Sequence, residues 1–459
     1  MLSRPGTSKI ILLILLPGLL LADLAHGVLL YNEINLPVSI LSLTRGVVFV
    51  IATYLAIAYH KYIENHYSIY VVGLLILTVP ALVISFNSPP LARPMIHAML
   101  DDLPLVIPVG PASTYSPSRV LYYEIKELTK LMYGPLLILM YLVLLNRKLV
   151  DSRAIMKFIE YAAYFAGVSL FLMQQFHIGD LTYGKWMSGE KGFFSSQNDI
   201  SLTLAIALFA AVYRMIVSPG IVRFILLAIS LFGLAGLGTR TSLFSSILVT
   251  IAVILVLLYG ISDTWSLSRK RRMLAFMAPI ILTAGLWTLY TAYNLAIEHS
   301  SQKRKIDVVL EGDHPRQFLI DAGICHINKR DTLSNIAGEG VYFFQTGVYK
   351  CLTGKSDSVK LVEVDWMDLY GAYGIGLVFL IHLLLLYLTF RALIDFIRYR
   401  QPEMGIIFLM FGLYTAHSAL AGHALTGPMP TSIIAAVGGV LLYQWSHATN
   451  INNNNALTS

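Results

Sequence analysis

The polar side chains that could perform chemistry gather in residues 297–364 and at the ends of the apolar segments around this interval. The candidates are two arginines, three acidic residues, one histidine and both cysteines of the chain, namely Arg240, Arg316, Glu363, Asp365, Asp368, His423, Cys325 and Cys351. A polar interval of this length between apolar segments is uncommon and often functional, although a plain spacer or an extramembrane cap is an alternative. We therefore expect any reaction to take place in this interval or on the helix ends that face it.

The two arginines could bind a phosphate-bearing ligand. A guanidinium is always charged, and its planar donors can bind two oxygens of a diphosphate at once. Arg240 lies in the turn GLGTRT between two apolar segments, where a charge is costly unless it meets a partner or a ligand. The alternatives are an interfacial anchor or an internal ion pair for Arg240, and a solvated loop charge for Arg316. The pair predicts a diphosphate site if both arginines face one cavity.

The acidic residues Glu363, Asp365 and Asp368 lie where the polar interval ends and the next apolar segment begins. Asp365 and Asp368 share one face of a helix, so either could take a proton from a hydroxyl or bind a cation. Carboxylates in the first turn of a helix are also ordinary partners of the helix dipole. His423 lies at the end of a later apolar segment. It could accept or donate a proton in a reaction, or it could be a buried, hydrogen-bonded histidine without a chemical role.

The composition places these residues in a membrane protein. Of the 459 residues, 56% are hydrophobic and 13% are charged, far from the mix of a soluble domain. Twelve stretches approach the length of about 20 apolar residues that a spanning helix needs, and they are too continuous for the strands of a barrel. We expect an all-α polytopic protein with spans at residues 9–31, 36–59, 68–87, 128–146, 154–176, 197–217, 221–238, 241–260, 273–296, 365–390, 404–422 and 431–445.

The distribution of charge predicts the orientation of these spans. Lys and Arg cluster in alternate short loops, for example at residues 147–157, 269–272 and 391–400. Because positively charged loops stay in the cytoplasm, we expect both termini there and residues 297–364 outside, between the ninth and tenth spans. The formal charge of +7 is then a topology signal with a weak attraction for anionic lipid, and it does not indicate a nucleic-acid partner.

We expect one membrane domain over residues 1–459 with three distinctive polar parts. Residues 88–127 are rich in proline and lead into VLYYEIKELTKLMY, which predicts an amphipathic helix along the outer surface or, alternatively, a lid that contacts substrate. Residues 297–364 form the large outer loop, a candidate lid over an active site. Residues 448–459 are polar and of low complexity, and we expect them to be disordered.

The two cysteines of the outer loop could form a disulfide bond. An oxidising compartment would allow Cys325 and Cys351 to join, and the bridge would stabilise the loop by about 2 to 4 kcal/mol. Two free thiols are the alternative. The chain has no C-x-x-C pair, P-loop, dinucleotide fingerprint, zincin motif or nucleophile elbow, so we expect no nucleotide-driven step within it.

Four segments together resemble the superfamily of O-antigen ligases and Wzy-type polysaccharide polymerases, which are membrane glycosyltransferases of the GT-C kind. GFFSSQNDISLTLAIAL resembles the family's Gly-Phe and Asn-Asp segment, and GLGTRTSLFSSILV resembles its Ser/Thr-Arg turn. DHPRQFLIDAG with LSNIAGEGVYFF resembles the Arg-bearing segment and the Gly-x-Gly of the family's large periplasmic loop. VEVDWMDLYGAYGIGLVFL resembles the segment of the family that re-enters the membrane. The likeness spans residues 192–422. Many family members carry a His-Asn pair where Glu363 and Val364 stand here, so Glu363, Asp365 or His423 are the substitutes.

The resemblance implies sugar transfer on the periplasmic face of the bacterial inner membrane, from an undecaprenyl-diphosphate-linked oligosaccharide to a sugar hydroxyl. Arg240 and Arg316 would stabilise the charge that develops on the diphosphate. Asp365 or Glu363, with Asp368 and His423 nearby, would supply the base for an inverting attack. The resemblance implies no cofactor and no metal. Membrane lipid, a flippase and a chain-length regulator are the expected partners.

Several functions remain open at this point. A polymerase for O-antigen or exopolysaccharide and an O-antigen ligase differ in the acceptor, which is another lipid-linked repeat unit or the lipid A core. We favour the polymerase because the Glu-Val-Asp sequence departs from the His-Asn form of ligases. A lipid-linked oligosaccharide flippase or another transporter would need charges near the bilayer midplane and paired broken helices. In a structural subunit of an envelope assembly, Arg240 and Arg316 would not face one cavity.

Overall fold

The computed structural model describes residues 5–34, 36, 38–87, 117–182, 189–218, 220–259, 316–356 and 358–457. Within them the chain is almost entirely helical, with one antiparallel pair of strands, β1 (Asp180–Leu181) and β2 (Glu190–Gly192). Helices suit a chain in lipid because each segment satisfies its own backbone N–H and C=O groups. Seven of the described helices are long and apolar enough to cross a membrane. The prediction of an all-α, multi-pass membrane protein is therefore confirmed.

The helices of the described part follow most of the predicted spans. The span predicted at residues 273–296 lies outside the described residues. The elements of the bundle are α1 (Pro5–Leu15), α2 (Pro17–Tyr31), α3 (Ile40–Ala58), the 3₁₀ turn η1 (His60–Tyr62), α4 (Asn65–Asn87), α6 (Pro117–Asn146), α7 (Ser152–Gln175), α8 (Gln197–Val217), α9 (Ile221–Gly236), α10 (Arg240–Tyr259), α16 (Asp365–Tyr399), α17 (Pro402–Leu420) and α18 (Pro428–Leu457).

Three features of these helices bear on the expected spans. The first span is divided into α1 and α2 at Pro17, because proline has no N–H for the helix ladder and suits the first turn of a new helix. The surface helix expected before the fourth span is instead the first half of α6, which continues through Pro135. α18 is described to Leu457, within the segment for which the sequence predicts disorder, and that expectation stays a prediction.

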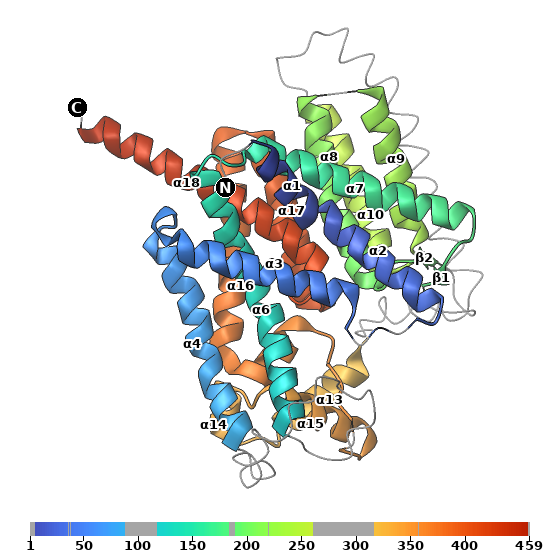
Figure 1. Ribbon diagram of the computed structural model, residues 1–459, viewed down its shortest axis with the longest axis vertical. Helices are drawn as coiled ribbons and strands as arrows, with labels where there is room; N and C mark the ends of the chain where they lie inside the picture. Colours follow the sequence, from blue (N-terminus) through green and yellow to red (C-terminus); the bar gives the residue numbers. More distant parts are fainter. Residues whose placement is uncertain are drawn as a thin grey trace.

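The centre of the bundle is formed by α8 and its neighbours. α8 is buried on all sides from Ile200 to Tyr213 and contacts α7, α10, α17 and α18. α18 also packs along α6, and α16 packs along α17. In Figure 1, α13, α14 and α15 lie at the lower end of the bundle, whereas α18 leaves it at the upper end. The described part of the polar interval, in residues 316–364, therefore lies at one end of the bundle.

Three short helices form what we call the helical loop, residues 316–364. They are α13 (Gln317–Ile327), α14 (Thr332–Ala337) and α15 (Val341–Thr353). A disulfide bond joins Cys325 of α13 to Cys351 of α15, with their Cα atoms 6.3 Å apart. The helical loop has a small apolar core of its own, made of Leu319, Ala322, Phe344, Val348, Val362, Val364 and Met367.

The helical loop docks on a break in α16. Gly374, inside α16, has φ 78° and ψ 179°, a conformation that is almost restricted to glycine. Just before this break, the carbonyls of Gly371 and Ala372 accept hydrogen bonds from outside the helix. Their donors are the backbone N–H groups of Glu339, at 3.4 Å, and Gly340, at 2.9 Å. The break therefore replaces hydrogen bonds within a helix by bonds between the helix and the loop.

Arg330 reinforces the same contact. Its side chain is only 2% exposed, and Nη1 donates to the Gly371 carbonyl at 2.8 Å and to Oε1 of Glu339 at 3.4 Å. The rings of Tyr370 and Phe344 lie 5.5 and 5.9 Å from the guanidinium. A buried cation is stable only when it is paired and hydrogen-bonded in this way. Arg330 is therefore an anchor of the helical loop.

Replacing Gly374 by alanine should destabilise the protein. The new Cβ would lie 2.1 Å from the Ile336 carbonyl oxygen, and the backbone conformation disfavours any side chain. We expect Gly374→Ala to lower the free energy of unfolding by about 2 to 3 kcal/mol, measured as a lower melting temperature of the detergent-purified protein. Gly376→Ala is the matched control, because its Cβ would be in ordinary contact with Leu77 at 3.5 Å. Equal melting temperatures for the two variants would contradict the role given to Gly374.

The disulfide bond can be tested by labelling. In intact cells, a membrane-impermeant maleimide should leave Cys325 and Cys351 unmodified and should label them after mild reduction. The double variant Cys325→Ser/Cys351→Ser is the control for labelling of other groups. Labelling of the wild-type protein without reductant would contradict the bond.

Candidate functional site

A cavity of about 190 Å³ lies between α6, α15, the start of α16 and the turn of residues 421–427. We call it the polar cavity. Its polar lining consists of Glu127, Lys130, Gln345, Asp365, Asp368, Tyr373, His423 and Thr426. Three of the candidate residues, Asp365, Asp368 and His423, thus line one cavity although α17 separates them in the sequence.

Asp365 joins the turn of residues 421–427 to the beginning of α16. Its side chain is buried. Oδ1 accepts the backbone N–H of His423 at 2.6 Å, and Oδ2 accepts that of Leu425 at 3.0 Å. Two main-chain donors satisfy a carboxylate that would otherwise be costly to bury. The contacts of Asp365 therefore hold one wall of the polar cavity in place.

Asp368 makes the corresponding contact with the end of the helical loop. Its Oδ1 accepts the N–H of Val362 at 2.9 Å, and its Oδ2 accepts the N–H of Glu363 at 3.0 Å. Asp365 and Asp368 lie in the first turn of α16, on the face that meets these loops. Each carboxylate thus binds two backbone N–H groups of a segment that leads to or from the cavity.

Glu363 is held between two cations. Nε of Arg316 lies 3.3 Å from Oε2, Nζ of Lys360 lies 2.7 Å from Oε1, and Nη1 of Arg316 also donates to the Glu363 carbonyl. Burial raises the pKa of Glu363, but the hydrogen bond from Lys360 and the charge of Arg316 outweigh it and hold the pKa below its ordinary value. Glu363 is therefore ionised at neutral pH, and a ligand of Arg316 would share that guanidinium with it.

His423 lines the polar cavity from a left-handed turn. Its φ is 66°, and the preceding Gly422 has φ 70° in a place where a Cβ would lie 2.2 Å from the Glu363 carbonyl oxygen. Burial lowers the pKa of His423, the negative charge of Asp365 opposes this effect, and the charge of Arg316 adds to it. The pKa lies below its ordinary value, so the ring is neutral at pH 7 and can either accept or donate a hydrogen bond.

Arg240 is the first residue of α10, and its side chain lies outside the described residues. The neighbouring Thr241 places Oγ1 3.5 Å from Nδ1 of His417, a buried residue of α17. Arg316 acts electrostatically on the same His417 and on His423. The start of α10 and the helical loop therefore both approach the end of α17 beside the polar cavity.

The sequence analysis missed four charged residues in this region. Glu127 and Lys130 line the polar cavity from α6, but they were assigned to a surface helix. Arg45 in α3 interacts electrostatically with Glu127 and with Asp199 at the start of α8. Arg45 could have been found, because a charge within an apolar span marks a functional site by default. Glu127 and Lys130, at i and i+3, fit a surface helix and a spanning helix equally well.

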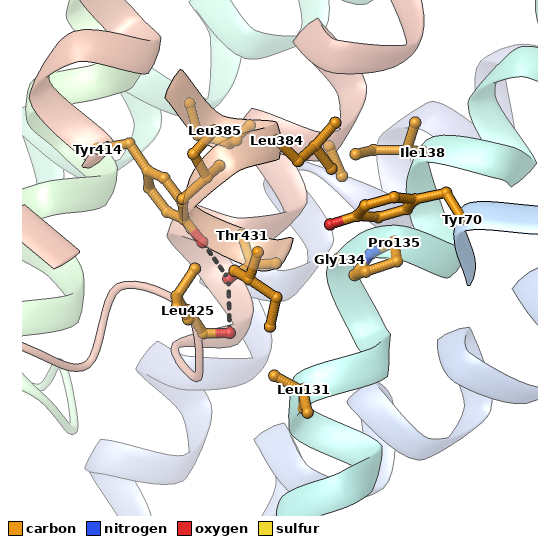
Figure 2. Close-up of a pocket in the computed structure, with 13 residues that line it drawn as sticks. Tyr70, Leu131, Gly134, Pro135, Ile138, Leu384, Leu385, Tyr414, Leu425 and Thr431 are labelled. Atoms are coloured by element: carbon orange, nitrogen blue, oxygen red, sulfur yellow. Dashed lines mark hydrogen bonds between the residues drawn. The ribbon is translucent and has the colours of Figure 1, made fainter. Parts of the chain in front are cut away.

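An apolar cavity of about 60 Å³ lies beside the polar cavity, between α4, α6, α16, α17 and α18. Leu131 and Leu425 line both cavities. Figure 2 shows Tyr414 and Tyr70 on opposite sides of the apolar cavity, and Tyr414 is hydrogen-bonded to Thr431 at 3.1 Å. A polar space and an apolar space therefore meet at two leucines near one end of the bundle.

The part of the chain that the structure describes holds no group of three or more His, Cys, Asp or Glu side chains arranged to bind a metal ion. No protein-family model matches the sequence, and no curated protein matches it. The candidate site is therefore defined by its own geometry, which combines buried carboxylates, a neutral histidine and nearby cations in the wall of one cavity.

The Glu363 ion pair predicts a pH-dependent stability. Because the folded-state pKa of Glu363 is lowered, its contribution is fully present above the ordinary pKa of glutamate and is lost as the pH falls through the lowered value. Glu363→Gln should therefore cost about 1 kcal/mol at pH 7 and should reduce the loss of melting temperature below about pH 4.3. Glu33→Gln is a matched control, since Glu33 is exposed and also has a positive φ, 59°. Parallel pH curves for Glu363→Gln and the wild-type protein would contradict this role.

Proposed function

We propose that the protein is a membrane glycosyltransferase that builds a bacterial surface polysaccharide. It transfers a saccharide from an undecaprenyl-diphosphate carrier to a sugar hydroxyl of another lipid-linked repeat unit, with inversion. The observation that carries this proposal is the junction of the polar and apolar cavities at Leu131 and Leu425. A lipid-linked sugar is an amphiphile, and it needs an apolar and a polar space side by side.

The charges around the polar cavity suit this donor. Arg316 acts electrostatically on His423 and His417, and α10 begins with Arg240 beside Thr241, which contacts His417. Cations at this place would stabilise the negative charge that develops on the diphosphate as it leaves. The carboxyl groups of the lining, the amide of Gln345 and the hydroxyl of Tyr373 offer hydrogen-bond partners for sugar hydroxyls.

We place the polar cavity on the periplasmic side of the inner membrane of a bacterium, in a protein with twelve spans and both termini in the cytoplasm. The starts of α6, α16 and α18 lie at the end of the bundle with this cavity. The opposite helix ends carry the basic residues Arg147, Lys148, Arg153, Arg214, Arg223, Arg391, Arg398 and Arg400. This asymmetry supports the orientation, because basic loops stay in the cytoplasm.

Removing Arg240 tests the proposed function. In cells that express the variant instead of the wild-type chain, Arg240→Ala should lower the amount of long polymer by about 100-fold or more, because a cationic group at the leaving diphosphate is lost. Single lipid-linked repeat units should accumulate. The measurement is gel electrophoresis of the polysaccharide together with an immunoblot of the membrane fraction, which should show normal insertion.

Arg398→Ala is the control for this experiment, because Arg398 is an exposed arginine at the opposite end of the bundle. It should leave the polymer unchanged. Normal long polymer from an inserted Arg240→Ala protein would count against the glycosyltransferase function.

A further inference from the structure

The wall of the polar cavity that belongs to α6 carries a carboxylate with no role so far. Glu127 and Lys130 both line the cavity, and Nζ of Lys130 lies 2.5 Å from Oε1 of Glu127. Their side chains are 13% and 21% exposed, so the pair is largely enclosed but not sealed. An ion pair of this kind, at the wall of a cavity rather than inside a packed core, is accessible to a ligand.

Three other carboxylates at or near the cavity, those of Asp365, Asp368 and Glu363, are already bound by the protein. Asp365 and Asp368 each accept two backbone N–H groups, so a proton added to either one would weaken the attachment of a loop. Glu363 is held by Arg316 and Lys360, and it is not among the described residues that line the cavity. These three groups are therefore poorly suited to gain and lose a proton in each reaction cycle.

Glu127 differs from them in having a free oxygen. Oε1 is bound to Lys130, whereas Oε2 accepts no hydrogen bond from the described residues. The Glu127 side chain lines the polar cavity and is 13% exposed, so this oxygen is not enclosed by hydrogen-bond donors of the described residues. An acceptor hydroxyl in the polar cavity can reach an open carboxylate oxygen, and a base must first be within hydrogen-bond reach of its proton.

Two cations act on this carboxylate in its partly enclosed position. Lys130 is in direct contact with it, and Arg45 of α3 acts electrostatically on both Glu127 and Lys130. Nε of Arg45 is buried without a hydrogen-bond partner in the described part of the chain. The two cations therefore offset part of the cost of enclosing this carboxylate.

We propose that Glu127 is the general base of the transfer reaction, an inference that rests on the proposed function. The acceptor hydroxyl gives its proton to Oε2 of Glu127 while its oxygen forms a bond to the anomeric carbon of the donor. The bond from that carbon to the diphosphate oxygen breaks, and the diphosphate leaves with the bonding electrons. Glu127 returns the proton to solvent after the product leaves. Lys130 is a positioning residue that orients the carboxylate.

The test uses full-length protein in lipid nanodiscs and lipid-linked oligosaccharides extracted from a strain that lacks this protein. The initial rate of polyprenyl diphosphate release gives kcat and KM. Glu127→Gln keeps the shape and can still accept a hydrogen bond from Lys130, but it is not a base. We expect kcat to fall by about 100-fold to 10,000-fold with KM and melting temperature unchanged. A role in structure alone would change the melting temperature and not kcat in this way.

Matched variants separate the possible outcomes. Glu33→Gln should leave kcat unchanged. A wild-type protein that releases no polyprenyl diphosphate would remove the proposed function and this inference with it. An active wild-type protein with Glu127→Gln within threefold of its kcat would overturn only the role of Glu127, as would a folded Asp365→Asn or Asp368→Asn variant that alone loses the activity.

A second variant decides the matter if Glu127→Gln is not recovered as folded protein. Glu127→Asp keeps a carboxylate but moves it away from the substrate by about one bond. We expect kcat to fall by about tenfold or more, because a base displaced by about 1 Å loses much of its effect. An unchanged kcat in this variant would overturn the role of Glu127.

Discussion

The structure depends on two carboxylates, the buried Asp365 and the half-buried Asp368, that accept hydrogen bonds from backbone N–H groups of distant loops. Asp365 and Asp368 stand at the first turn of α16, in a region where neither a bare carboxylate nor an unpaired N–H group can be left without a partner. The N–H groups of His423 and Leu425 on one side, and of Val362 and Glu363 on the other, supply the partners. Both loops are thereby held against one helix end, and the polar cavity lies between them and α6.

A second contact, inside α16, also attaches the helical loop to this helix. At Gly374 the helix gives up its regular conformation, and the carbonyls of Gly371 and Ala372 bind the helical loop. Arg330 completes this contact with a buried guanidinium. The helical loop is therefore attached at its entry to α16 and again about two turns later, so it can hold residues of α15 at a fixed place in the cavity wall.

The cost of removing charged groups from water explains where the polar and apolar cavities lie. The charged groups of the candidate site lie near one end of the bundle, where their desolvation is less costly than at its centre. The neighbouring space is lined mostly by leucine, isoleucine, proline and tyrosine. Each cavity by itself is small. Leu131 and Leu425 line both cavities, and this shared wall supports the proposal of an amphiphilic ligand, whose head and tail require opposite surroundings. The left-handed turn at His423 belongs to the same boundary, since it aims the backbone at Asp365 and presents the ring to the polar side.

Hydrophobic periodicity and length alone determined that this is an all-α membrane protein, because a spanning helix must be apolar over most of its length whatever its neighbours are. The same signal placed most of the helices but misjudged α6, where Glu127 and Lys130 made the start of a long helix resemble a surface segment. The types of single residues, such as Asp365 and His423, also indicated which part of the chain holds the candidate site, but they did not show which groups each side chain contacts. Asp365 meets His423 across 58 residues and Glu127 meets its neighbours on α3 and α16 only after the bundle has packed. Burial, partners and access to a cavity are properties of several segments at once, so tertiary structure alone decided which carboxylate is bound and which is open.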